Sequence, residues 1–409
     1  MPWTNSFIIV LGLTLLTSPT AQDPGWRALE QNDIAAAHEW ANQALAQDTA
    51  NQRARHLRIL TRFLSGQFED ALADYELLSA AYPGRTEALS KVILDAYHHL
   101  DRYVDAANFA RLMDVPEPER AWLDERAAHP PTVTLEGTTI VPFAGDNFLG
   151  DLMPAVEVEL NGMPLVAHLD TGGDFIVMAP GRARELGVQT RLVGSGVANN
   201  QRTPVSRGLA DSLVLGDARF THVPVATVES LTGQLETLVI LGTRVLSRFL
   251  MTWDNDQGRL ILTARNADVA RSQHLTDHAA GLEGVDFYLH SDHYLWVHGT
   301  VAGHDALMFL DTGLVTLDPS GHQPAGGIPA SMLDAWDVAY TDGFTEPLSV
   351  SVGSANREVN SFSVFPDRRN LPRLESTGPD ILLSHGFFKH FVWTLDFDDY
   401  KLYLKPIVQ

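Results

Sequence analysis

The chain has 409 residues, of which 45% are hydrophobic, and its 29 Lys and Arg stand against 51 Asp and Glu, which gives a net charge of −22. This composition is sufficient for the cores of two or three domains. The acidic surface argues against binding to nucleic acid or to an anionic membrane. The sequence has no cysteine, which excludes disulfides, thiolate catalysis and cysteine-ligated zinc.

The first 21 residues are predicted to be a signal peptide. The apolar run FIIVLGLTLL, from Phe7 to Leu16, is followed by the polar, small-residue segment TSPTAQ. The run is too short to span a bilayer comfortably, and the pattern favours cleavage near Ala21. We therefore expect export to the periplasm. Because no Lys or Arg precedes the run, an uncleaved membrane anchor is the alternative, and only in that case do we expect membrane contact.

Residues 22–129 are Ala-rich, helical in pattern and internally repetitive. The segments NDIAAAHEWANQAL, GQFEDALADYELLS and DRYVDAANFARLMD align without gaps. Ala37, Ala71 and Ala106 correspond, with spacings of 34 and 35 residues. This period, with a small residue where paired helices pack, resembles tetratricopeptide repeats. The resemblance implies an all-α repeat domain that recruits a protein substrate or partner; a plain helical bundle is the alternative.

The pattern changes at AAHPPTV, residues 127–133, because two prolines end a helix and begin an extended segment. Beyond it, short alternating runs separated by Gly, Asn and Asp predict strands and turns. AVEVELNGMPLVAHLD predicts a β-hairpin with Asn161-Gly162 as its tight turn. We therefore predict an all-β region made of two lobes, residues 133–265 and 266–409.

The two predicted lobes repeat one motif. The tripeptide DTG follows an apolar strand at residues 170–172 and again at residues 311–313. LVILG, which ends at Gly242, and ILLS, which ends at Ser384, lie 72 and 73 residues after the respective aspartates. Asp, Thr and Gly are common in ordinary turns, but turn chemistry does not require a second matched element. The pattern therefore indicates a duplicated fold.

A further pair of segments supports this duplication. FLMTWDNDQGRLIL follows the first motif and FVWTLDFDDYKLYL follows the second. Their alignment matches Thr252 with Thr394 and Asp254 with Asp396.

These matched elements resemble the two half-sites of an aspartic protease. Each half is similar to a retropepsin domain, and the tandem arrangement is similar to the bilobal pepsin plan. The resemblance covers roughly residues 133–409 and implies a mostly β, bilobal fold with a cleft that hydrolyses peptide bonds. The implied catalytic pair is Asp170 and Asp311, and the implied supporting residues are Thr171, Gly172, Gly242, Thr312, Gly313 and Ser384.

The same residues can be interpreted from their chemistry. Two carboxyl groups within hydrogen-bond distance share one proton over a wide pH range. The ionised group can act as a general base on water while the protonated group polarises a carbonyl, so neither a cofactor nor a metal is needed. We therefore expect an aspartic endopeptidase that acts on a peptide or protein substrate. The alternative is a weak or inactive protease-like scaffold that binds peptide or protein.

Three departures from the family pattern favour that alternative. Gly173 and Leu314 follow the two DTG motifs, where such enzymes usually have Ser, Thr or Ala, and Ser384 replaces an expected glycine. The best candidate for a flap over the cleft is GSGVANNQRTPVSRG, residues 194–208.

The segment LHSDHYLWVHG offers a metal alternative. If it forms a continuous strand, His290, Asp292 and His298 share one face. Imidazole and carboxylate are good zinc ligands, but histidine spacing alone is a weak signal. We expect a solvated strand here rather than a metal site.

Overall fold

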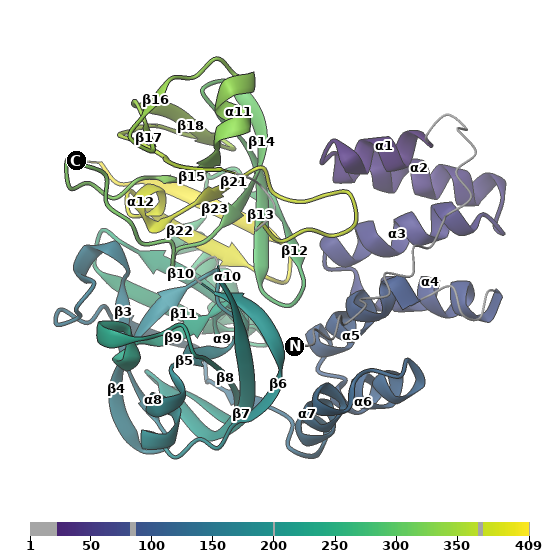
Figure 1. The fold of residues 1–409 in the computed structure, drawn as a ribbon, viewed down its shortest axis with the longest axis horizontal. Helices are drawn as coiled ribbons and strands as arrows, with labels where there is room; N and C mark the ends of the chain where they lie inside the picture. Colours follow the sequence, from purple (N-terminus) through teal and green to yellow (C-terminus); the bar gives the residue numbers. More distant parts are fainter. Residues whose placement is uncertain (1–22, 82–86, 199–200, 367–370, 409) are drawn as a thin grey trace, which may run out of the picture.

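A computed structural model describes residues 23–81, 87–198, 201–366 and 371–408. The predicted signal peptide lies outside these residues. Figure 1 shows a stack of helices beside two β lobes, one built around β3–β9 and the other around β12–β21. The predicted fold class, an all-α region followed by a bilobal all-β region, is confirmed. Within the described residues, none of the helices is both long and apolar enough to cross a membrane.

The helical region contains seven α-helices in its described part. Each of the three related segments forms one helix, and the aligned residues Ala37, Ala71 and Ala106 are fully buried. An alanine at these positions lets neighbouring helices approach closely. The helices are α1 (Pro24–Glu30), α2 (Ile34–Gln47), α3 (Gln52–Leu64), α4 (Phe68–Ala81), α5 (Ser90–His99), α6 (Tyr103–Leu112) and α7 (Glu117–Ala128).

The first lobe is built on an eight-stranded sheet with the order β1-β8-β5-β9-β4-β3-β7-β6. The predicted hairpin is confirmed, since β3 and β4 pair antiparallel and Asn161 and Gly162 both have positive φ, 51° and 78°. Its strands are β1 (Thr132–Thr134), β3 (Ala155–Leu160), β4 (Met163–Asp170), β5 (Ile176–Met178), β6 (Arg191–Ala198), β7 (Gln201–Leu215), β8 (Ala218–Val228) and β9 (Val239–Gly242).

A second sheet of fifteen strands forms the other lobe and continues into the first. From the first half of the β region it takes β2 (Thr138–Pro142), β10 (Phe249–Asp254) and β11 (Arg259–Ala264). Its remaining strands are β12 (Val285–His290), β13 (Tyr294–Val301), β14 (His304–Leu310), β15 (Gly326–Pro329), β16 (Tyr340–Thr341), β17 (Phe344–Thr345), β18 (Leu348–Val352), β19 (Ala355–Val359), β20 (Ser363–Phe365), β21 (Ile381–Leu383), β22 (Phe391–Asp396) and β23 (Lys401–Pro406).

The lobes are joined where β10 pairs antiparallel with β22. The register sets Thr252 opposite Thr394, the two residues that the sequence alignment matched. Their hydroxyl oxygens are 2.6 Å apart, and the neighbouring rings of Trp253 and Trp393 stack with centroids 4.8 Å apart. The duplicated segments therefore meet each other at the centre of the molecule.

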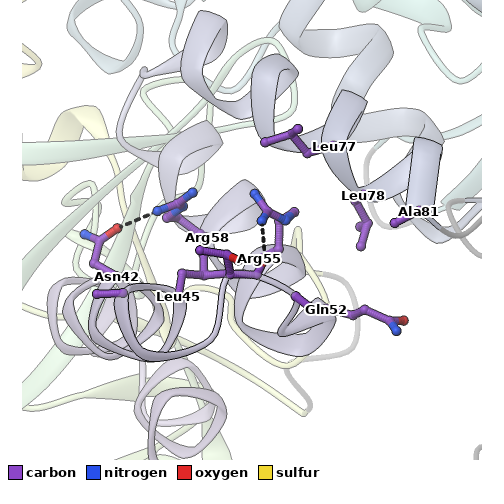
Figure 2. A pocket seen from close by; sticks show the side chains of 11 residues that line it. Asn42, Leu45, Gln52, Arg55, Arg58, Leu77, Leu78 and Ala81 are labelled. Atoms are coloured by element: carbon purple, nitrogen blue, oxygen red, sulfur yellow. Dashed lines mark hydrogen bonds between the residues drawn. The ribbon is translucent and has the colours of Figure 1, made fainter.

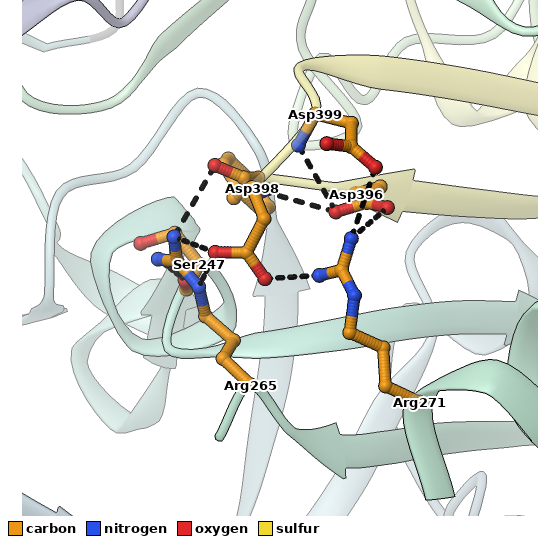
Figure 3. A network of polar contacts seen from close by, with 7 residues as sticks. Ser247, Arg265, Arg271, Asp396, Asp398 and Asp399 are labelled. Carbon is orange, nitrogen blue, oxygen red and sulfur yellow. Dashed lines mark hydrogen bonds and ion pairs between the residues drawn. The ribbon is translucent and has the colours of Figure 1, made fainter. Parts of the chain in front are cut away.

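A charged network reinforces this junction (Figure 3). Arg271, on α10 (Asp268–His278), donates from Nη2 to the fully buried carboxylate of Asp396 at 2.7 Å and also contacts Asp398. Arg265 donates from Nε to Asp398 at 2.6 Å. The segment after β11 is thus bound to the turn between β22 and β23.

The helical region packs against both lobes. Asp101 accepts two hydrogen bonds from Arg248 of the first lobe, at 2.9 and 2.7 Å. Asn32 donates to Asp380 of the second lobe at 3.1 Å. A Cβ at Gly66 would lie 2.0 Å from the ring of Tyr400, so this backbone lies directly on the second lobe. The helical region is therefore an integral part of the folded molecule.

Candidate active site

The first DTG loop is held at the end of a buried strand. β4 ends at Asp170 and pairs in parallel with β9, and the register sets Asp170 opposite Gly242. A Cβ at Gly242 would lie 1.8 Å from the carbonyl oxygen of Asp174, so any larger residue would displace the loop. The matched LVILG segment thus lies directly beside the loop that carries Asp170.

The second loop repeats this arrangement. β14 ends at Leu310, pairs in parallel with β21, and sets Leu310 opposite Leu383. The N–H of Asp311 donates to the carbonyl of Leu383 at 2.8 Å. Ser384 follows in the place that Gly242 holds in the first lobe.

Two threonines connect the loops across the lobe junction. The N–H of Thr171 donates to Oγ1 of Thr312 at 2.9 Å, and the N–H of Thr312 donates to Oγ1 of Thr171 at 3.0 Å. The Thr171 hydroxyl also donates to the carbonyl of Leu310 at 2.6 Å, and the Thr312 hydroxyl donates to that of Leu169 at 3.3 Å. Both threonines are fully buried, so these hydrogen bonds fix one loop relative to the other.

The two carboxyl groups face each other between these loops. Oδ1 of Asp170 accepts from the N–H of Gly172 at 2.7 Å and from the N–H of Gly313 at 3.0 Å. A Cβ at Gly172 would lie 2.5 Å from Oδ1 of Asp311, and one at Gly313 would lie 2.4 Å from Cγ of Asp170. Each glycine is therefore needed so that the carboxyl group from the opposite loop can approach.

The electrostatics of the pair favour a single shared proton. Burial raises the pKa of Asp311 well above its usual value, and the charge of Asp170 and a hydrogen bond to Asp170 raise it further. Burial also raises the pKa of Asp170, but the N–H groups of Gly172 and Gly313 oppose this effect. The pair therefore favours a state with one shared proton, and the pKa of Asp311 is the one raised more strongly.

Part of the first lobe matches a known protein family. Residues 156–245 match the family model described as aspartyl protease, a span that includes the first DTG loop and Gly242. The resemblance to aspartic proteases is confirmed. Among solved structures, a retropepsin-like aspartic protease from Rickettsia conorii is 21% identical, covers 33% of this chain and 95% of its own, and has a TM-score of 0.25. None of the curated proteins matches the chain significantly.

The departures from the protease pattern have distinct structural settings. Ser384 is fully buried; its hydroxyl donates to the carbonyl of Pro324 at 2.7 Å and accepts from the N–H of Gly386 at 3.0 Å, which caps the helix α12 (His385–Phe388). A Cβ at Gly173 would lie 3.5 Å from Oδ2 of Asp170, so a hydroxyl there would be close to the carboxylate. Leu314 is partly buried and donates its N–H to the carbonyl of Asp311 at 3.2 Å.

The flap candidate is part of a hairpin formed by β6 and β7. Gly194 pairs with Val205 in this hairpin, beside an irregularity in the register. Residues 199 and 200 of this segment lie outside the described residues.

Sequence reasoning missed a turn from the second lobe that lies beside the dyad. β12 ends at His290, Ser291 has a φ of 55°, and β13 begins at Tyr294, so the predicted continuous strand is wrong. His290, Ser291 and Asp292 are buried, which also contradicts the expected solvated strand. The sequence did not indicate this turn, because the positive φ is taken by Ser291, whereas glycine or asparagine is more common in that conformation.

The turn at residues 291–293 lies close to Asp170. Nδ1 of His293 is 2.7 Å from Oδ1 of Asp292. The positive charge of His293 acts on Asp170 and lowers the pKa of that carboxyl group, although burial has the larger, opposite effect. The Asp292–His293 pair therefore belongs to the electrostatic environment of the dyad.

Helix α5 of the helical region fixes the same turn. Lys91 Nζ is 2.7 Å from the hydroxyl of Ser291, which donates to Asp95 at 3.2 Å. A ring nitrogen of His99 is 2.9 Å from the Ser291 carbonyl, and its other ring nitrogen accepts from Arg244 at 2.8 Å. Arg244 lies just after Gly242 in the first lobe, and Ser291 belongs to the second lobe. Helix α5 therefore binds a segment beside the dyad in each lobe.

The potential metal ligands differ from those that the sequence suggested. His298 is exposed on β13, away from the buried His290 and Asp292. Among the described residues, the side chains that come together are Asp174, Asp292 and His293, with ligand atoms within 4.8 Å of one another. Asp174 also lies 3.7 Å from Arg207, so a cation of the protein already pairs with this group.

Proposed function

We propose that this protein is an exported aspartic endopeptidase in which Asp170 and Asp311 activate water for hydrolysis of a peptide bond. The observation that carries the proposal is a pair of facing carboxyl groups, of which Asp170 is buried and Asp311 is partly buried. They come from two lobes whose loops are joined by the reciprocal hydrogen bonds of Thr171 and Thr312. Two carboxyl groups in hydrogen-bond contact retain one proton, as acid–base catalysis by such a pair requires.

The mechanism follows from the asymmetry of the pair. Ionised Asp170 removes a proton from the attacking water, and protonated Asp311 donates a hydrogen bond to the scissile carbonyl. The carbon becomes tetrahedral, and a proton is then delivered to the leaving amine, which breaks the C–N bond. Gly172 and Gly313 hold Oδ1 of Asp170 through their N–H groups, so the base is already oriented before substrate binds.

Two further parts of the proposal concern location and recruitment. The apolar segment at Phe7–Leu16 is consistent with export. The helical region is proposed to recruit a protein substrate or partner, and its contacts with Ser291 and Arg244 position it beside the site of hydrolysis.

Substitution of the dyad tests the proposal. Asp170→Asn and Asp311→Asn should each reduce hydrolysis of a quenched fluorescent peptide at least about a hundredfold, because each removes an acid–base group. A statine-type inhibitor should block the wild type. Circular dichroism of both variants checks that the fold is retained. Folded variants with near wild-type rates would exclude the mechanism, and an inhibitor-insensitive, inactive wild type would favour the scaffold alternative.

A further inference from the structure

A groove lies in the helical region, apart from the dyad (Figure 2). It has a volume of about 720 Å³ and is formed by α2, α3 and α4. This volume falls in the range of pockets that bind small ligands or peptide side chains. Leu45, Leu77 and Leu78 supply apolar surface, and Arg55 and Arg58 supply guanidinium groups. Leu77 is 59% exposed, so its side chain is accessible to a ligand in the groove.

Three arginines beside the groove converge on one buried carboxylate. Asp74 is 2% exposed, and its Oδ1 accepts from Arg55 at 3.0 Å and from Arg58 at 2.6 Å. Its Oδ2 accepts from Arg58 at 2.7 Å and from Arg62 at 2.6 Å. Each oxygen of the Asp74 carboxylate therefore already accepts two hydrogen bonds, which is close to its capacity.

The groove consequently has an excess of positive charge. Three guanidinium groups surround the Asp74 carboxylate. None of the 11 residues that line the groove is acidic. This local excess occurs in a chain whose net charge is −22. Partly buried guanidinium groups keep their charge and favour a carboxylate partner that can accept from two N–H groups.

We propose that this groove binds an acidic peptide segment that also carries apolar side chains. Its carboxylates would pair with Arg55 and Arg58, and its apolar side chains would cover the exposed side chain of Leu77. The inference rests on the recruiting role proposed above and specifies the chemistry of the recruited segment. Such a segment would belong to a protein substrate or partner and would bind independently of the dyad.

The direct test is binding of a defined probe to the full-length Asp170→Asn protein, which cannot consume it by the proposed mechanism. The probe is a fluorescein-labelled nonapeptide that alternates glutamate with leucine, and binding is followed by fluorescence anisotropy. We expect saturable binding that weakens as salt is added. A probe with glutamine in place of glutamate should bind about tenfold more weakly, because charge-assisted hydrogen bonds are lost.

Surface substitutions locate the binding site. Leu77→Glu should weaken binding of the acidic probe about tenfold through like-charge repulsion. Leu77→Lys loses the same apolar contact but adds a positive charge, so it should weaken binding much less. Val104→Glu is the matched control, because Val104 is also 59% exposed but lies on α6 outside the groove. Arg55→Gln should weaken binding, but it also removes a partner of Asp74, so Leu77→Glu is the decisive variant.

The outcomes separate this inference from the proposed enzyme activity. Equal affinity for the glutamate and glutamine probes, equal effects of Leu77→Glu and Val104→Glu, or no binding at millimolar protein would overturn the groove assignment. Hydrolysis of a short quenched peptide is measured in parallel with protein that retains Asp170. Hydrolysis without groove binding would refute only the groove, and groove binding without hydrolysis would refute only the peptidase.

Discussion

Thr171 and Thr312 each donate a backbone N–H to the hydroxyl of the other, at 2.9 and 3.0 Å, although they are 141 residues apart. Both side chains are inaccessible to solvent. Each hydroxyl also donates to a carbonyl of the opposite strand, so the two loops cannot move apart without leaving buried polar groups unpaired. This link fixes the distance between the carboxyl groups, and several predictions depend on it.

Removal of one of these hydroxyls should reduce both activity and stability. Thr171→Val keeps the shape of the side chain but leaves the N–H of Thr312 and the carbonyl of Leu310 without this partner. We expect a loss of about 1–3 kcal/mol in the free energy of unfolding, measured by urea denaturation. Thr171→Ser is the control and should lose less because it retains the hydroxyl; equal losses would show that the methyl group dominates.

A methyl group beside the dyad should abolish hydrolysis. In Gly172→Ala, the new Cβ would lie 2.5 Å from Oδ1 of Asp311, which requires the carboxyl groups to move apart. We expect kcat to fall at least about a hundredfold, since catalysis depends on this geometry. Gly145→Ala is a suitable control, because no atom lies within 4 Å of its Cβ position. Comparable kcat values for the two variants would contradict the proposed approach of the carboxyl groups.

The pH profile should report the charge of His293. Hydrolysis needs one ionised and one protonated carboxyl group, so the rate should follow a bell-shaped curve. Burial raises the pKa of Asp170, and the positive charge of His293 lowers it. His293→Gln should therefore move the acidic limb of kcat/KM toward neutral pH. His322→Gln, at an exposed position, should leave that limb in place; a profile unchanged in both variants would exclude His293 from the environment of the dyad.

Acid should destabilise the junction between the lobes. His274 is 4% exposed and lies within hydrogen-bond distance of Thr252 and Thr263. Burial lowers the pKa of His274 from 6.5 to about 4, so the unfolded chain binds the proton more readily than the folded one. Stability should therefore fall as the pH drops below about 6.5 and level off near pH 4, with this residue contributing about 3 kcal/mol.

Melting temperatures between pH 8 and pH 4 provide the measurement. His274→Gln should show a shallower decline with falling pH than the wild type. The exposed substitution His322→Gln should retain the full slope. Identical slopes in all three proteins would show that His274 does not contribute to this dependence.

Catalysis should not require a second copy of the chain. Asp170 and Asp311 belong to one polypeptide, and the link between their loops is intramolecular. Specific activity should therefore remain constant when the enzyme is diluted over several orders of magnitude. If specific activity instead falls as the protein is diluted, the site is assembled between two chains.

The sequence predicted the elements that its residues mark locally, in the site and in the lobe that supports it. The DTG loops, the segments behind them and the Asn161-Gly162 turn each have a local signature, and the structure places them as expected. The contribution of helix α5 could not be predicted this way. His99 and Ser291 are 192 residues apart and meet only through tertiary packing, for which neither residue type carries a signal.

The helical region shows the same limit of sequence reasoning. Its period indicated helices that pack through small residues, and Ala37 and Ala71 are buried accordingly. A repeat pattern does not reveal which surface docks on a neighbouring domain. The contacts of Asp101 with Arg248, and of Gly66 with Tyr400, depend on single residues outside the repeated positions.

The strands β22 and β23 have a consequence for the order in which the molecule matures. β22 pairs with β10 and β23 pairs with β12, so these late segments connect elements that leave the ribosome much earlier. Until they emerge, β10 lacks its partner strand, and the buried carboxylate of Asp396 is not yet available to Arg271. A nascent chain can therefore contain both dyad aspartates without the sheet that joins their lobes. We therefore expect the proposed hydrolysis only after β22 and β23 have been synthesised and paired, although both aspartates precede them in the chain.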